Sequence, residues 1–142
     1  MIEVYTDGSC LGNPGVGGWA FLAIKDGNII SKSGLDKNTT NNRMELNAAI
    51  EALDFLKNEK KLTIYTDSSY LKNGISSWIS SWKKNLWLNS KKKPVKNKDL
   101  WIKLETLTKD RNITWQWVKA HHENKYNIIV DELARKEAEN AS

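Results

Sequence analysis

Short apolar runs separated by turn signals occupy the first third of the chain. Residues 2–7, 19–24 and 28–33 are predicted strands, and Asp26-Gly27 between the last two is typical of a tight hairpin. Residues 12–15, with one proline between glycines, have the composition of a turn because proline fixes φ and glycine permits positive φ. This part of the chain predicts an antiparallel meander.

The apolar positions change to helical spacing after this meander. Leu46, Ile50 and Leu53 recur at i, i+4 and i+7, so residues 43–57 are predicted to form a helix with one apolar face. Residues 61–66 are again a predicted strand. The intervening helix allows this fourth strand to return beside the first in parallel, through a right-handed crossover.

The second half of the chain predicts further helices and one more strand. Residues 68–84 are expected to form one or two short helices interrupted at Asn73-Gly74, and residues 99–107 another. Residues 113–118 are a predicted fifth strand, and residues 130–139 a final helix. The predicted fold class is α/β, with a five-stranded mixed sheet, an antiparallel meander plus parallel strands, flanked by helices.

Length and composition favour one soluble domain. The 142 residues, seven of them tryptophan, suit a single domain over residues 1–142. A single cysteine, Cys10, cannot form an internal disulfide and fits a reducing compartment. The first strand starts at once, so we expect no secretory signal, and no apolar run approaches the roughly 20 residues of a membrane helix. A cytoplasmic protein without a membrane partner is expected.

The formal net charge of +5 is unevenly distributed. Residues 68–98 contain eight lysines and no acidic residue, whereas the other residues carry 14 basic against 17 acidic side chains. A basic segment on a mildly acidic domain favours a polyanionic partner. A lysine-rich loop that only keeps the protein soluble is the alternative.

Four carboxylates stand where one edge of the predicted sheet could collect them. Asp7 and Asp67 each end a predicted strand after a Tyr-Thr pair. Glu45 lies in the first turn of the helix after the meander, and Asp131 opens the last helix. Clustered carboxylates raise each other's pKa, and a divalent cation keeps them ionised together. Ligands that are all oxygen suit Mg²⁺ or Mn²⁺ rather than zinc.

Each of these carboxylates also has a purely structural interpretation. Asp7 could belong to a turn, and Asp67 could cap a helix. Glu45 could complete a capping box with Asn42, the expected N-cap. Asp131 could complement a helix dipole. Their common position at one sheet edge favours a metal site over the four separate interpretations.

Several ordered motifs of the chain resemble type 1 ribonuclease H, from about residue 2 to residue 137. They are Tyr5-Thr6-Asp7-Gly8-Ser9, Gly12-Asn13-Pro14-Gly15, Thr40-Asn41-Asn42-Arg43-Met44-Glu45-Leu46, Tyr65-Thr66-Asp67-Ser68 and Asp131-Glu132-Leu133-Ala134. Residues 76–98, with Trp87 among lysines, resemble the basic handle of bacterial members. The resemblance implies endonucleolytic cleavage of the RNA strand of RNA–DNA hybrids, leaving 5′-phosphate and 3′-hydroxyl ends.

The same resemblance assigns the four carboxylates to two Mg²⁺ ions, with Mn²⁺ as a possible substitute. By analogy Asp7 bridges both ions, and Asp131 helps to hold the ion that binds the attacking water. Glu45 and Asp67 hold the second ion, and Glu45 also lies near a ribose 2′-hydroxyl. Two ions can activate water and stabilise the departing 3′ oxygen.

A histidine that follows the fifth strand in the family, and helps proton transfer or product release, matches His121. The family commonly has Gly-His followed by a small residue and Gly, whereas this chain has Ala120-His121-His122-Glu123. His122 could therefore share or take over the role. Either histidine could instead be a solvated loop residue.

The resemblance also implies contacts with an RNA–DNA hybrid. Thr40 and Asn97 match a pocket for a DNA-strand phosphate, where Asn38 replaces an arginine of some members. Trp78 matches a residue near the DNA strand, and Ser69 replaces a glutamine that often contacts RNA. The positions expected along the shallow groove are Cys10, Asn13, Asn41 and Asn42.

Tryptophans and lysines alternate in the expected handle. Trp78 and Trp82 lie one helical turn apart, so their rings could pack on sugars or bases while lysines neutralise phosphates. The two rings could instead pack the handle itself. The lysines expected to bind substrate are Lys83, Lys84, Lys91, Lys92, Lys93 and Lys96. We expect a monomer that binds hybrids with little regard to sequence.

Two other functions compete with this metal-dependent nuclease. A non-catalytic hybrid-binding module of the same fold would retain the lysines and tryptophans but lose a ligand, whereas all four carboxylates are present. A related enzyme acting on DNA, such as a transposase or resolvase core, is disfavoured by the complete motif at residues 40–46 and by the handle.

Overall fold

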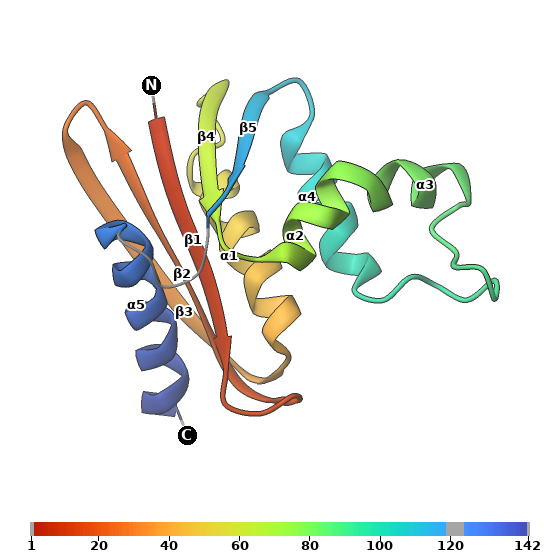
Figure 1. Cartoon of the computed structure of the whole chain (residues 1–142), viewed down its shortest axis with the longest axis horizontal. Helices are drawn as coiled ribbons and strands as arrows, with labels where there is room; N and C mark the ends of the chain where they lie inside the picture. The colour runs from red at the N-terminus through yellow and green to blue at the C-terminus, as the bar shows by residue number, and fades with distance from the viewer. Residues whose placement is uncertain (1, 119–123, 142) are drawn as a thin grey trace.

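Five strands form one sheet in the order β3-β2-β1-β4-β5 in the computed structural model, which describes residues 2–118 and 124–141 (Figure 1). β1 (Ile2–Cys10), β2 (Gly15–Lys25) and β3 (Asn28–Thr39) are antiparallel neighbours. β4 (Lys61–Thr66) pairs in parallel with β1 and with β5 (Asn112–Trp117). The predicted mixed sheet is confirmed, a meander followed by parallel strands.

The strands of the meander are longer than predicted. β1 continues beyond Asp7 because it stays paired with β2, with Asp7 opposite Ala20 and Cys10 opposite Gly17. Asp7 therefore lies inside a strand, which corrects its predicted position at a strand end. What stops before Asp7 is the parallel ladder with β4, which runs to the pair Tyr5 and Tyr65.

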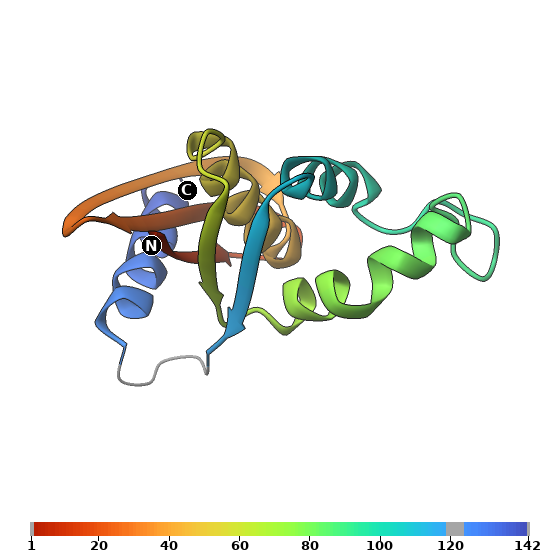
Figure 2. The same cartoon turned by 90° about the horizontal axis from the view of Figure 1, so that it is seen from above.

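Helices cover both faces of the sheet (Figure 2). α1 (Asn41–Phe55) and α4 (Lys98–Thr108) lie over the larger core, whose fully buried side chains include Phe21, Leu46 and Trp101. α5 (Lys125–Ala141) packs on β1, β2 and β3 from the other side. A smaller cluster of buried residues lies beneath it: Tyr5, Ala20, Leu22, Val130 and Ala134.

α1 begins two residues earlier than predicted because Thr40 is its N-cap. Thr40 Oγ1 accepts a hydrogen bond from the backbone N–H of Arg43 at 3.2 Å. The predicted capping box of Asn42 and Glu45 is therefore wrong. Glu45 is the fifth residue of the helix and lies beyond its first turn, where it is buried.

α5 also begins earlier than predicted, at Lys125. Asn124 Oδ1 accepts hydrogen bonds from the backbone N–H groups of Tyr126 at 2.9 Å and Asn127 at 3.2 Å, which satisfies donors that a helix start leaves unpaired. Asp131 consequently lies in the second turn of α5, and the prediction that it opens the helix is wrong.

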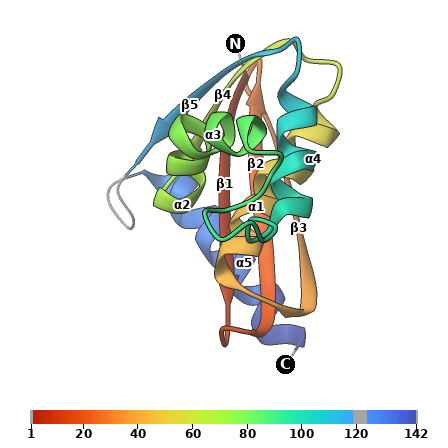
Figure 3. The same cartoon turned by 90° about the vertical axis from the view of Figure 1, so that its right-hand side faces the viewer.

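The handle projects from the sheet at the side of β5 (Figure 1), so it lies in front of the sheet in the end-on view of Figure 3. α2 (Ser69–Asn73), the π-helical segment η1 (Gly74–Trp78) and α3 (Ile79–Lys84) follow one another without a gap. The predicted interruption at Asn73-Gly74 is thus a change of helix type, since Gly74 keeps helical angles of −62° and −47°. Residues 85–96 return to α4 with only one isolated bridge, between Leu88 and Pro94. No described helix has the length and apolar character needed to cross a bilayer.

Candidate active site

Three carboxylates meet where the ladder between β1 and β4 stops. Asp7 lies in β1, Glu45 in α1, and Asp67 directly after β4. One oxygen from each lies within 4.8 Å of the others. Asp7 and Glu45 are buried, 4% and 6% exposed, and Asp67 is half-buried. Three of the four predicted ligands therefore lie together.

The strand register explains why Asp7 and Asp67 meet. Tyr5 and Tyr65 are opposite each other across the parallel ladder, and their rings stack with centroids 4.7 Å apart. Parallel strands advance at the same rate, so the residues two positions further along each strand arrive at the same level. The repeated Tyr-Thr-Asp sequence becomes two carboxylates side by side.

Gly8 allows α1 to bring Glu45 against β1. A Cβ atom at Gly8 would overlap the backbone of Met44 and Glu45, so only glycine permits this approach. The backbone N–H of Gly8 donates to Asp7 Oδ1 at 2.9 Å. The glycine therefore both admits the helix and orients the neighbouring carboxylate.

Asp131 approaches the same group from α5. Side chains alternate along a strand, so Asp7 lies on the same side as Tyr5, which packs beneath α5. Burial is the main cause that raises the pKa of Asp7, and Asp131 raises this pKa further, which indicates that Asp131 lies close to it. Asp131 is outside the group of three, and its Oδ2 accepts a hydrogen bond from Arg135 at 3.0 Å. The fourth predicted ligand thus lies at the margin of the cluster.

Burial and mutual repulsion make this cluster a poor place for several negative charges. Burial, and then the charge of Asp67, raises the pKa of Asp7 from 3.8 to about 8. Burial, and then the charges of Asp7 and Asp67, also raises the pKa of Glu45 well above its usual range. Glu45 Oε1 is buried without a hydrogen-bond partner. An all-oxygen cluster with an unsatisfied buried oxygen fits a hard divalent cation such as Mg²⁺ or Mn²⁺.

Residues predicted to follow the groove of a hybrid gather at the start of α1. Asn13 Oδ1 accepts a hydrogen bond from the backbone N–H of Asn41 at 3.2 Å, which ties the loop after β1 to the helix. Cys10, at the end of β1, donates from Sγ to the carbonyl of Gly12 at 2.6 Å. Asn41 and Asn42 are exposed in the first turn of α1.

The residues predicted to contact phosphate or RNA are only partly brought together. Arg43 links Thr40 and Asn97, because its backbone N–H donates to Thr40 Oγ1 and its Nη1 donates to Asn97 Oδ1 at 3.2 Å. Asn38 is exposed on β3, and Ser69 is the exposed first residue of α2. Among the described residues, no hydrogen bond joins either of these two to Thr40 or Asn97.

The tryptophans of the handle pack against one another. The ring centroids of Trp78 and Trp82 lie 5.8 Å apart, and Trp82 also contacts Trp87 and Trp101. For Trp82 this favours the packing interpretation over direct stacking on a base. Lys83 forms an ion pair with Glu105 at 2.8 Å. The other predicted substrate lysines are exposed: Lys84, Lys91, Lys92, Lys93 and Lys96.

The structure does not describe two of the predicted site residues, and it shows three residues near Asn97 that were not predicted. His121 and His122 lie outside the described residues. Sequence reasoning assigned no role to Arg43, Tyr70 or Asp99, which contact Asn97 or each other. Arg43 stands inside a recognised motif and could have been found, whereas Tyr70 looked like any aromatic residue of a core-facing helix.

Comparisons with known proteins agree on one family. The RNase H family model matches residues 1–139. The ribonuclease H of Francisella philomiragia is 54% identical over 135 residues, which cover 95% of this chain and 89% of that protein. The ribonuclease H of Francisella tularensis subspecies novicida shows the same identity and coverage.

Solved structures show the same fold. LC9-RNase H1, described as a type 1 RNase H with the type 2 active-site motif, has a TM-score of 0.86 and 28% identity, covering 99% of this chain and 73% of that chain. LC11-RNase H1, solved in complex with RNA/DNA hybrid, has a TM-score of 0.72 and 23% identity, covering 99% of each chain.

Proposed function

This chain belongs to the ribonuclease H family, and we propose that Asp7, Glu45, Asp67 and Asp131 form its metal-dependent active site. The family activity is hydrolysis of the RNA strand of RNA–DNA hybrids, so the protein is an endoribonuclease acting on hybrids. The observation that carries the site assignment is the meeting of three carboxylates within 4.8 Å around a buried, unpartnered Glu45 oxygen.

Mg²⁺ is the proposed metal, with two ions in the substrate complex and Mn²⁺ as a substitute. When bound, the metal supplies a nucleophilic water and stabilises the charge that develops on the departing 3′ oxygen. Asp7, Glu45 and Asp67 would hold it, and Asp131 would complete the set from α5. All four carboxylates belong to one chain, which supports action as a monomer.

The hybrid is proposed to lie across the start of α1 and the handle. The polar side chains of Asn13, Asn41 and Asn42 offer hydrogen bonds to sugars and bases in the shallow groove. Thr40 and Asn97 hold a phosphate of the DNA strand, and the exposed handle lysines neutralise further phosphates. Proton transfer or product release by His121 stays a prediction of the sequence.

The direct test compares a labelled RNA–DNA hybrid, double-stranded RNA and double-stranded DNA, each with either Mg²⁺ or EDTA present. We expect cleavage only of the RNA strand of the RNA–DNA hybrid, only with metal, and with 5′-phosphate and 3′-hydroxyl ends. Cleavage of double-stranded DNA, or activity that persists in EDTA, would contradict the proposal. Binding of hybrid without any cleavage would favour the non-catalytic binding module.

Asp7→Asn separates catalysis from binding. The substitution removes a ligand charge from the centre of the cluster, so we expect turnover to fall by about a thousandfold or more, while hybrid still binds at low salt. Single-turnover cleavage and a binding titration measure the two effects. Asp54→Asn, an exposed site in the last turn of α1, makes the same charge change and should leave both unchanged. Normal turnover in Asp7→Asn would remove Asp7 from the active site.

A further inference from the structure

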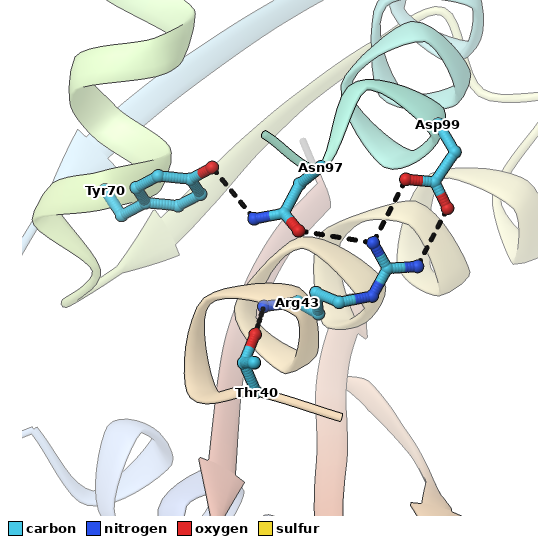
Figure 4. A network of polar contacts seen from close by, with 5 residues as sticks. All are labelled: Thr40, Arg43, Tyr70, Asn97 and Asp99. Carbon is cyan, nitrogen blue, oxygen red and sulfur yellow. Dashed lines mark hydrogen bonds and ion pairs between the residues drawn. The ribbon is translucent and has the colours of Figure 1, made fainter. Parts of the chain in front are cut away.

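Asn97 occupies an unusual position between the handle and α4. Its backbone is left-handed, with φ of 61° and ψ of 27°, a conformation that asparagine adopts more readily than most residues. It stands at the N-cap position of α4, yet its side chain makes no capping hydrogen bond. The side chain lies instead between residues of α1 and α2 (Figure 4).

Arg43 fixes which way the Asn97 amide faces. A guanidinium has donors only, so the group that faces Arg43 Nη1 at 3.2 Å must be the amide oxygen. The guanidinium is itself held by Asp99 through two hydrogen bonds, Nη1 to Oδ1 at 3.0 Å and Nη2 to Oδ2 at 2.8 Å. These two hydrogen bonds restrict the guanidinium of Arg43 to one orientation. The amide nitrogen of Asn97 must therefore point away from Arg43.

Tyr70 is the hydrogen-bond partner of that amide nitrogen. Asn97 Nδ2 donates to the phenolic oxygen of Tyr70 at 3.0 Å, and Trp101 Nε1 donates to the same oxygen at 3.0 Å. Trp101 is fully buried, and the Tyr70 ring packs against both Trp101 and Trp78. The phenolic oxygen is thus fixed by the core of the protein.

The amide nitrogen retains a second hydrogen. An amide NH₂ has two donors, and among the described residues Tyr70 is the only acceptor recorded for Asn97 Nδ2. With the oxygen committed to Arg43 and one N–H to Tyr70, the remaining N–H has a single fixed direction. A donor fixed before binding loses little conformational entropy when it meets its acceptor.

We propose that Tyr70 is a positioning residue for the DNA strand, which aims the remaining Asn97 N–H at a phosphate oxygen. The inference rests on the phosphate-binding role proposed above for Asn97 and Thr40. Tyr70 does not need to touch the hybrid itself. Its contribution passes through the amide of Asn97, and its effect should therefore disappear when that amide is removed.

Tyr70→Phe tests this directly because it removes one oxygen and keeps the packed ring. We expect the KM for hybrid to rise about three- to tenfold with kcat unchanged, the effect of one neutral hydrogen bond. Tyr126→Phe, on the opposite face of the sheet, is the matched control and should leave KM unchanged. An unchanged KM in Tyr70→Phe would overturn the inference.

A double-mutant cycle with Asn97→Ala separates positioning from a general loss of stability. Asn97→Ala alone should raise KM, and adding Tyr70→Phe to it should raise KM no further, although the melting temperature can still fall. Additive effects on KM would overturn the positioning role. If the Asn97→Ala variant is active and its KM for hybrid is unchanged, the proposed phosphate contact is overturned. A wild-type protein without hybrid cleavage would overturn the proposed function instead.

Discussion

Asp7 is a buried acid that stays protonated to a higher pH in the folded protein than in the unfolded chain. Its pKa rises from 3.8 to about 8, so between these two values the folded protein keeps a proton that the unfolded chain releases, and the metal-free protein loses stability as the pH rises across this interval. Glu45 is shifted in the same direction by burial and by the same neighbours. At the proposed metal site a divalent cation would replace these protons, so metal should stabilise the fold most where the protons are lost.

The melting temperature should therefore respond jointly to metal and pH. We expect the difference in Tm between saturating Mg²⁺ and EDTA to widen between about pH 5 and about pH 8, because metal binding then competes with fewer protons. Thermal melts over this range measure it. Asp7→Asn should narrow the difference, and Asp54→Asn should not. A difference that is the same at every pH would contradict the assignment of metal to these carboxyls.

Helix capping shows why single residues were ambiguous in the sequence. Asp67 could have been an N-cap, but Ser68 caps α2, with Oγ accepting the backbone N–H of Leu71 at 3.1 Å. Thr40 likewise replaces the expected Asn42, and Asn124 provides the start of α5. Neighbouring Ser, Thr and Asn residues are all suitable N-caps, and tertiary packing decides at which of them the helix begins. The carboxylates were recognisable only as a set.

At the scale of elements, one arginine connects the ends of two helices. Arg111 Nη2 donates to the carbonyl of Leu56 at 2.7 Å, and its Nη1 donates to the carbonyls of Leu53 and Leu107 at 3.1 and 2.9 Å. Its Nε donates to the carbonyl of Glu59 at 3.1 Å. These carbonyls belong to the last turns of α1 and α4 and to the loop before β4, so the side chain satisfies acceptors that helix ends leave unpaired.

Arg111→Met should destabilise the protein without changing the reaction that it catalyses. Loss of several hydrogen bonds from a charged donor should lower the free energy of unfolding by about 2–4 kcal/mol, as measured by urea denaturation. The exposed ion pair of Lys25 with Glu59 offers a control, since Lys25→Met should lower the free energy of unfolding far less than Arg111→Met. If the two substitutions cost the same, the arginine does not stabilise the helix ends.

Element types were predictable from the sequence, but element ends were not. β1 extends past Asp7 because β2 supplies hydrogen-bond partners as far as Gly17, although its own sequence turns polar there. At Gly74, where α2 gives way to the π-helical segment, a Cβ atom would overlap the ring of Trp101, so the absence of a side chain lets Trp101 pack there. A partner distant in sequence therefore decides where β1 ends, and another distant partner limits which residue can stand at position 74.

At the scale of the whole molecule, the binding surface proposed for the hybrid extends beyond the active site to the positively charged handle. Lys91, Lys92 and Lys93 are exposed in the irregular part of the handle, which projects from the sheet (Figure 1). Each lysine that neutralises a phosphate releases a counterion, so its contribution to affinity depends on salt. On the proposed function, the handle should therefore contribute to binding separately from the metal site.

Replacing Lys91, Lys92 and Lys93 together with alanine should weaken hybrid binding and flatten its salt dependence. The slope of log affinity against log salt should fall by about 2–3, which a binding titration at several salt concentrations measures. The matched control replaces Lys57, Lys60 and Lys61, which are exposed near the start of β4, away from Asp67. Equal slopes for both triple variants would leave the handle lysines with a solubilising role only.

The stacked pair Tyr5 and Tyr65 also determines where the chain tolerates insertions and deletions. The ladder between β1 and β4 sets the level of Asp7 against that of Asp67, so a turn elsewhere in the chain can change length without altering their spacing. The hairpin tip at Gly27, which faces open space, can gain residues freely. One residue deleted within β4 would instead turn every following side chain to the other face of the sheet. Length variation among related chains should therefore accumulate at such tips and avoid the two paired strands.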